Sequence, residues 1–302
     1  MMRTLGCCLI ILLVSCMAVR AGALDALKKV DINKVKGSVE SGAKVGKAMR
    51  SGFADLTESE EYYIGRAVAA TILSRYELSS DKSMTAYINR VGGVLAGVSD
   101  RPETFGGYHF CVIDSDEINA FAAPGGFIFV TRGLLARAPN EEAVAAVLAH
   151  EIAHVCLKHG LKAIKQSRLT GAFAVLAAEG AKQYGPGEVA QLTEAFGGAI
   201  SDIAQNMIEK GYSRSQEFEA DNLAVIYLGR AGYSSGGLLA LLNGLRQSEG
   251  GEHTSAGFGK THPSAGDRAD KVHTQIENSG GPGEPNPVRT ARWTPYLRHL
   301  AP

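Results

Sequence analysis

The sequence predicts an α+β protein that is mainly helical, with a small β-sheet beside one buried helix. Three observations support this fold class. Most of the chain after Asn140 has helical apolar spacing, and the runs 108–113 and 127–130 have the composition of strands. A buried helix from about residue 140 carries the two histidines of His150-Glu151-Ile152-Ala153-His154. About 275 mature residues suffice for one substantial core.

The N-terminus, residues 1–22, is typical of a signal peptide. Arg3 precedes an apolar stretch over residues 5–14 that is too short to span a membrane stably. Two cleavage sites remain open, because Leu13-Val14-Ser15-Cys16 resembles a bacterial lipobox and Ala21-Gly22-Ala23 fits a signal peptidase. Acylation of Cys16 would anchor the protein to a membrane face. Alternatively, Cys16 is one more apolar residue of the signal core. We therefore expect a periplasmic protein, held at the outer membrane if Cys16 is acylated.

The first half of the mature chain should hold a tether, two helices and two strands. Residues 23–55, rich in Lys, Gly and Ser, predict the tether, and one domain should cover 56–277. Thr57 with Glu60 predicts a capping box that opens a helix to about Arg75, and Ser80 or Asp81 should begin a second to about Leu95. The strands 108–113 and 127–130 follow, separated by Pro124-Gly125-Gly126.

The second half should be helical. Asn140 is a candidate N-cap for the helix of the two histidines, and a helical hairpin is expected over 161–184 and 188–210. That hairpin either packs on the core or lies against a membrane or client protein. Ser213 should cap another helix, and a further one is expected from Ser264 to Glu277. Residues 278–302, which contain Trp293 and Tyr296, predict a flexible tail.

The most informative motif is His150-Glu151-Ile152-Ala153-His154. Residues four apart lie on one face of a helix, so the two imidazoles can bind one divalent metal ion. Glu151 is then placed to polarise a metal-bound water instead of binding the ion. The pattern predicts a zinc site with a hydrolytic water.

A third ligand is expected on the helix that Ser213 caps. Glu217 and Asp221 lie one turn apart there, and two histidines plus a glutamate from a separate helix form a catalytic zinc set. Asp221 would orient one ligand histidine. Glu219 points elsewhere on the helical wheel, and the alternative is that all three carboxylates form a solvated acidic face. His159 is expected to be structural, since it lies off the face of His154.

Several spaced motifs resemble one known family. They are the run 119–135, Asn140-Glu141-Glu142, the motif at 150–154, His159, Ser213-Arg214 with Glu217 and Ala220-Asp221, and Thr261-His262-Pro263 with Arg268. Together they resemble the gluzincin metallopeptidases of the HtpX, Oma and CAAX prenyl protease type, on the side of the bacterial periplasmic BepA and LoiP proteases. The resemblance covers about residues 56 to 275. One departure is that the chain has no room for the transmembrane helices or helical repeat of some relatives.

The resemblance implies a zincin-like metalloprotease domain with one Zn²⁺ per chain, bound by His150, His154 and Glu217. Glu151 would be the general base, taking a proton from water and returning it to the leaving amine. His262 would lie near the metal, and three roles for it stay open: a latch on the fourth zinc position, a donor to the oxyanion, or helix-end packing. Arg268 is the other candidate oxyanion donor.

Substrate recognition is expected at a sheet edge. The strand that contains Phe127, Ile128 and Phe129 could take up an extended peptide by backbone hydrogen bonding, with Asn119 near its entry. Such recognition favours unfolded or misassembled proteins of the cell envelope, in agreement with the quality-control role that the resemblance implies. The alternative is an envelope assembly factor or chaperone whose zinc is structural or blocked, which would not need Glu151.

Composition limits the remaining possibilities. The chain has 31 basic and 31 acidic residues, so it offers no net field for nucleic acid, and its partners should be proteins. Cys111 and Cys156 would be the cysteines of the folded part, most simply as small core residues, although an exported compartment permits a disulfide.

Overall fold

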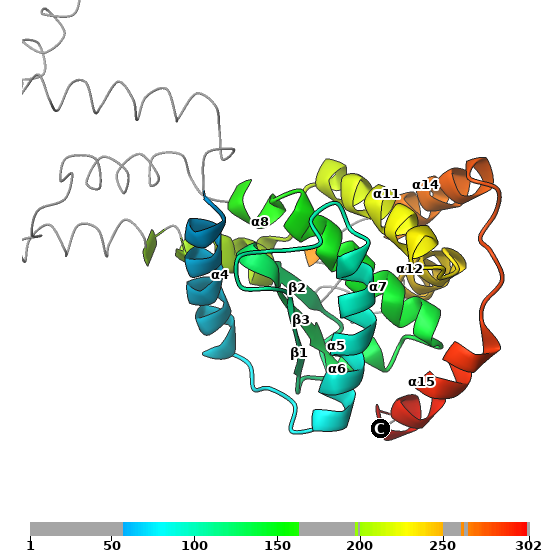
Figure 1. Ribbon diagram of the computed structural model, residues 1–302, viewed down its shortest axis with the longest axis horizontal. Helices are drawn as coiled ribbons and strands as arrows, with labels where there is room; N and C mark the ends of the chain where they lie inside the picture. The colour runs from blue at the N-terminus through cyan, green and yellow to red at the C-terminus, as the bar shows by residue number, and fades with distance from the viewer. Residues whose placement is uncertain (1–56, 163–196, 199, 250–260, 263–264, 301–302) are drawn as a thin grey trace, which may run out of the picture.

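The computed structural model describes residues 57–162, 197–198, 200–249, 261–262 and 265–300. Within these residues the fold is mainly helical with a three-stranded sheet, and the predicted α+β class is confirmed (Figure 1). The expected signal peptide, tether and most of the hairpin over 161–210 lie outside the described residues. None of the described helices is long and apolar enough to cross a membrane.

Two helices precede the sheet. The first, α4, runs over Glu58–Leu73, and the second, α5, over Lys82–Gly97. Asp81 caps α5, because its side chain accepts a hydrogen bond from the Met84 backbone N–H at 2.9 Å. The predicted start of this helix is therefore confirmed.

The sheet consists of β1 (His109–Ile113), β2 (Ala120–Ala123) and β3 (Phe127–Thr131) in the order β1-β3-β2. Strand β1 is parallel to β3, whereas β2 is antiparallel to it and is joined to it by the short helix η2 (Pro124–Gly126). Gly125 has a φ of 75°, a conformation that glycine adopts readily. Strand β2 had no clear strand signal in the sequence, since three of its four residues are alanine.

The strand order corrects one expectation. The prediction that Phe127, Ile128 and Phe129 form a substrate-binding edge is wrong, because β3 is the central strand and both of its sides are paired. Ile128 and Phe129 are also buried on opposite faces, in two different core clusters. Side-chain alternation along the strand explains this, since successive residues face α5 and α7 on one side and α4 on the other.

The centre of the molecule is α7 (Glu141–Cys156), which lies between the sheet and a group of later helices (Figure 1). Asn140 caps it as predicted, and every residue from Glu141 to Val155 is buried. A short helix α6 (Arg132–Leu135) leads to α7, and α8 (His159–Lys162) follows it. A helix buried on all sides must pair its polar side chains within the protein, so its histidines and glutamates need internal partners.

The later helices divide between the two sides of the sheet. Residues 200–205 are helical and end in the π-helix η3 (Asn206–Lys210), which contacts β2 and belongs to the core cluster of α4. Helices α11 (Arg214–Arg230) and α12 (Gly236–Glu249) pack on α7, and α14 (Ala265–Asn278) packs on α11 and α12. Ser213 caps α11 and forms a capping box with Gln216. The predicted starts at Ser213 and near Ser264 agree with these bounds.

The C-terminal segment differs from the expected flexible tail. Residues Pro287–Leu300 form the helix α15, which packs against α6 and α7. Trp293 is fully buried, and its indole N–H donates to the Ala138 carbonyl at 2.7 Å. Arg292 donates to both carboxylate oxygens of Glu141 at the start of α7. The prediction is wrong here because the anchoring contacts come from residues more than 130 positions away in the chain.

Candidate metal centre

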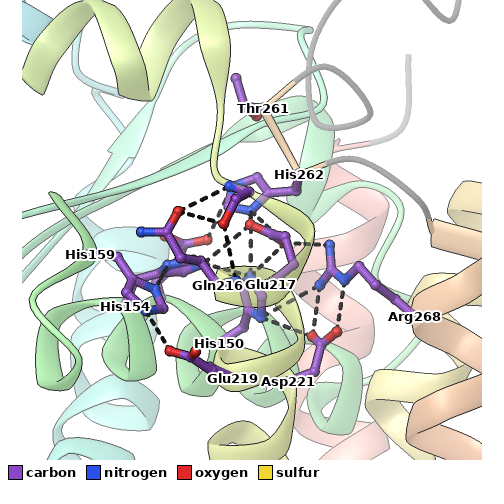
Figure 2. A network of polar contacts seen from close by, with 12 residues as sticks. His150, His154, His159, Gln216, Glu217, Glu219, Asp221, Thr261, His262 and Arg268 are labelled. Atoms are coloured by element: carbon purple, nitrogen blue, oxygen red, sulfur yellow. Dashed lines mark hydrogen bonds and ion pairs between the residues drawn. The ribbon is translucent and has the colours of Figure 1, made fainter. Parts of the chain in front are cut away.

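Two turns of α7 and one turn of α11 bring the predicted ligands together. His150 and His154 lie on one face of α7, and their Nε2 atoms are 3.0 Å apart. Glu217, in the first turn of α11, places Oε2 at 3.4 Å from Nε2 of His150 and Oε1 at 3.6 Å from Nε2 of His154. Figure 2 shows the three side chains converging with His262. All four are buried and could hold a metal ion together.

The spacing of these atoms fits zinc. A tetrahedral ion with bonds near 2.1 Å holds its ligand atoms about 3.4 Å apart. Nδ1 of His262 lies 3.0 Å from Oε1 of Glu217 and 3.4 Å from Nε2 of His150, and the four ligand atoms all lie within 4.8 Å of one another. Three imidazoles and one carboxylate are also a donor set that zinc prefers. The residues present therefore fit the ion.

Glu151 lies beside the cluster without being part of it. Its Oε1 is 3.7 Å from Nε2 of His262, and neither carboxylate oxygen has a hydrogen-bond partner among the described residues. Burial raises the pKa of this carboxyl above its usual range, although His262 and His150 act in the opposite direction. A buried carboxylate without hydrogen bonds is costly, so its position is suited to receiving a proton from a molecule that enters the site.

Asp221 and Arg268 contact two of the ligand residues and hold them in position. Asp221 accepts from Nδ1 of His150 at 3.0 Å, which leaves Nε2 of that ring for the metal. Arg268, from α14, contacts both oxygens of Asp221 at 2.7 Å and Oε2 of Glu217 at 2.8 Å. Burial alone would raise the pKa of Asp221, but Arg268 and His150 outweigh it and lower that pKa to about 2. This ion-pair network fixes two ligands in place.

The guanidinium of Arg268 thus contacts two carboxylates of the protein, those of Asp221 and Glu217. Burial would also raise the pKa of Glu217, yet its neighbours His262 and Arg268 hold it well below its usual range. Both partners remain charged. The geometry places the Arg268 guanidinium on two carboxylates of the protein, and its expected role as oxyanion donor stays a prediction.

His159 and Glu219 form a second support that the sequence did not reveal. Nδ1 of His159 is 2.8 Å from Nδ1 of His154, and its Nε2 is 3.2 Å from Oε2 of Glu219. Burial lowers the pKa of His154 well below its usual value and that of His159 to about 4, so both rings are neutral near neutral pH. Since His154 faces the metal position with Nε2, its Nδ1–H donates to His159, which in turn donates to Glu219.

Tyr212 is a further neighbour that sequence reasoning missed. Its ring stacks on His154 with centroids 4.1 Å apart, and its buried hydroxyl has no hydrogen-bond partner in the described part of the chain. Burial, followed by the charges of Glu151 and Glu217, raises the pKa of this phenol well above its usual value. Its place directly before the capping residue of α11 is the one sequence signal that could have identified it.

Thr261, next to His262, is held by two neighbours. The Thr261 hydroxyl donates to Oδ1 of Asn119 at 2.8 Å, and the Thr261 carbonyl accepts from the Tyr212 backbone N–H at 3.0 Å. Gly211 permits this approach, because a Cβ there would lie 2.1 Å from the Thr261 oxygen. Asn119 is 2% exposed, and the structure places it against Thr261.

Comparison with known proteins agrees with the geometry. The sequence profile described as peptidase family M48 matches residues 82–276. The beta-barrel assembly-enhancing protease of Escherichia coli is 29% identical over 178 residues, which are 59% of this chain and 36% of that protein. Metalloprotease YcaL of Escherichia coli is 32% identical over 56% of this chain and 62% of its own length.

A eukaryotic relative extends the comparison. The mitochondrial metalloendopeptidase OMA1 of Schizosaccharomyces pombe is 29% identical over 227 residues, which are 74% of this chain and 63% of that protein. Each alignment thus spans less than two thirds of the relative's own length, and in the first case only about a third. The similarity concerns the domain that contains the histidine and glutamate cluster.

Proposed function

The chain belongs to peptidase family M48, and on this premise we propose that it is a zinc-dependent endopeptidase that hydrolyses unfolded or misassembled proteins of the cell envelope. The observation that carries the proposal is the arrangement of four buried ligand atoms within 4.8 Å of one another, beside the unpartnered carboxylate of Glu151. The envelope setting rests on the expected export signal and on the similarity to the beta-barrel assembly-enhancing protease.

His150, His154 and Glu217 would hold the ion during catalysis. Bound zinc supplies a Lewis acid that polarises the scissile carbonyl and lowers the pKa of water. Glu151 would accept the proton of the attacking water and return it to the leaving amine, a role favoured by its place beside the ligand set. Asp221 and His159 hold the two ligand imidazoles in the tautomers that leave their Nε2 atoms free.

His262 would act as a latch. Its Nδ1 lies where a fourth ligand belongs, and all four cluster residues are at most 2% exposed. A substrate carbonyl needs that fourth position, so His262 and Thr261 must withdraw before a peptide can react. The contacts of Thr261 with Asn119 and Tyr212 hold the loop in this closed arrangement.

The closed ligand set also favours a second candidate function. A zinc ion with four protein ligands is typical of a structural site, which would suit an assembly factor or chaperone of the envelope. Against it stands Glu151, since a permanently closed site gains nothing from a buried carboxylate without partners. We propose attachment to the outer membrane through an acylated Cys16 for either function.

Digestion of an unfolded protein separates the two candidates. The full chain, purified with zinc, should cleave casein into fragments, and a chelator should stop cleavage until zinc is restored. Circular dichroism during chelation shows whether the fold survives. Failure to cleave casein by a folded, zinc-loaded chain and by its His262→Ala variant would favour the structural role.

A further inference from the structure

One buried polar group beside the metal centre has no assigned role. The hydroxyl of Tyr212 is buried and makes no hydrogen bond to the described residues, although a phenol in the interior normally finds a partner. Tyr212 as a whole is 6% exposed. An unpaired buried hydroxyl costs stability, roughly 1–3 kcal/mol in general. A group kept at that cost next to reacting atoms is a candidate for a functional role.

The ring of Tyr212 lies against the metal centre. It stacks on His154 at an interplanar angle of 18°, and its centroid is 5.9 Å from that of His262. The charged side chains that act on the hydroxyl are those of Glu151 and Glu217. The backbone is fixed on one side by the hydrogen bond to Thr261 and on the other by the cap at Ser213.

Peptide hydrolysis needs a hydrogen-bond donor to the scissile carbonyl oxygen beside the metal. When water attacks the scissile carbonyl, its oxygen gains negative charge, and a preorganised hydrogen bond to it is usually worth a large factor in rate. The two donors expected from the sequence are otherwise engaged. Arg268 contacts Asp221 and Glu217, and His262 lies within the ligand set until it withdraws as the proposed latch.

We propose that Tyr212 is a catalytic residue whose phenol donates a hydrogen bond to the scissile carbonyl oxygen as that oxygen becomes charged. This inference rests on the proposed peptidase function. In the step concerned, the oxygen of water bonds to the carbonyl carbon and its proton passes to Glu151. The carbon–nitrogen bond then breaks and the proton passes from Glu151 to the amine. Tyr212 keeps its own proton throughout.

The test is Tyr212→Phe, which removes the hydroxyl and keeps the ring on His154. We expect kcat for a peptide substrate to fall by about 10² to 10³, the range for one lost oxyanion donor, with KM nearly unchanged. Zinc content and melting temperature should match those of the wild type. The matched control is Tyr227→Phe on α11, about 15 Å further along the helix axis than Glu217, which should leave kcat unchanged.

A second readout separates catalysis from positioning. A phosphonamidate peptide, which mimics the tetrahedral intermediate, should bind Tyr212→Phe more weakly by the same factor as the loss in kcat/KM. Wild-type kcat in Tyr212→Phe would overturn the inference while leaving the peptidase function intact. A second outcome would also overturn the inference. If Tyr212→Phe loses zinc, and binds the phosphonamidate as tightly as the wild type once zinc is restored, then Tyr212 only supports His154. A wild-type chain that cleaves no peptide would overturn the proposed function itself.

Discussion

The carboxylates of α11 should differ sharply in their effect on zinc binding. Glu217 contributes ligand atoms, Asp221 orients His150 through a contact of 3.0 Å, and Glu219 acts on His154 only through His159. Removing an orienting group typically costs 10 to 100-fold in metal affinity, which corresponds to about 1.4 to 2.7 kcal/mol. We therefore expect Asp221→Asn to bind zinc by that factor more weakly.

The other two substitutions bracket this value. Glu217→Ala should abolish zinc binding in the measurable range, because only two α7 histidines and the latch remain. Glu219→Gln should cost less than Asp221→Asn, since the Glu219 side chain is 52% exposed and water can replace its contact with His159. The order of the three affinities is the decisive quantity.

Competition with a chromophoric zinc chelator measures these affinities. The metal-free proteins must also be compared by urea denaturation, because Asp221→Asn weakens a buried ion pair with Arg268. Breaking such a pair costs about 3–5 kcal/mol when nothing replaces it, and the remaining contact of Arg268 with Glu217 should keep the loss below that range. Zinc affinity that falls more in Glu219→Gln than in Asp221→Asn would refute the assigned roles.

Two further predictions concern the loop at 261–262 and the C-terminal helix. His262→Ala should hydrolyse peptides faster than the wild type if His262 is a latch, whereas a fall in kcat of about 10² with zinc retained would make it an oxyanion donor instead. Unchanged kcat with a lower melting temperature would leave His262 a packing role only. Trp293→Ala should lose about 3–5 kcal/mol of unfolding free energy in urea denaturation, because the indole is fully buried and hydrogen-bonded. Val288→Ala on the same helix is the control, since its side chain is 63% exposed and should change stability by less than about 0.5 kcal/mol. Equal stability of Trp293→Ala and the wild type would show that α15 adds nothing to the fold.

Local signals explain which parts of the fold were predictable. The caps at Asp81, Asn140 and Ser213 are set by residues three positions apart, and the histidine pair is set by one helical turn. Glu217 could be chosen because its helix begins clearly at Ser213. For these elements, sequence spacing is almost equivalent to geometry.

The missed elements depend on contacts that are distant in sequence. Strand β2 consists of Ala120, Phe121, Ala122 and Ala123, and only its pairing with β3 makes it a strand. The same pairing turns β3 from an edge into the central strand. Helix α15 contains a proline and few apolar residues, so its stability comes from Trp293 and Arg292 packing on α6 and α7.

The residues of the metal centre likewise fall into those that could be predicted from sequence and those that could not. Its ligands on α7 and α11 follow from motif spacing, but its supports do not. His159 meets Glu219 across 60 residues, and Tyr212 meets His154 across the segment that includes the predicted hairpin. Their roles became visible only when the relative positions of α7 and α11 were known. Arg268 could be identified from its sequence motif, but its contacts with Asp221 and Glu217 became known only from the structure.

Substitution of Glu151 by glutamine tests the central claim most directly. The Glu151→Gln chain and the wild type should be compared for zinc content, melting temperature and casein cleavage. The proposed peptidase predicts about one zinc per chain and an intact fold in both, with hydrolysis reduced by several orders of magnitude in the variant, since Glu151 moves the proton and does not bind the ion. Loss of zinc from Glu151→Gln, or cleavage at the wild-type rate, would contradict this assignment.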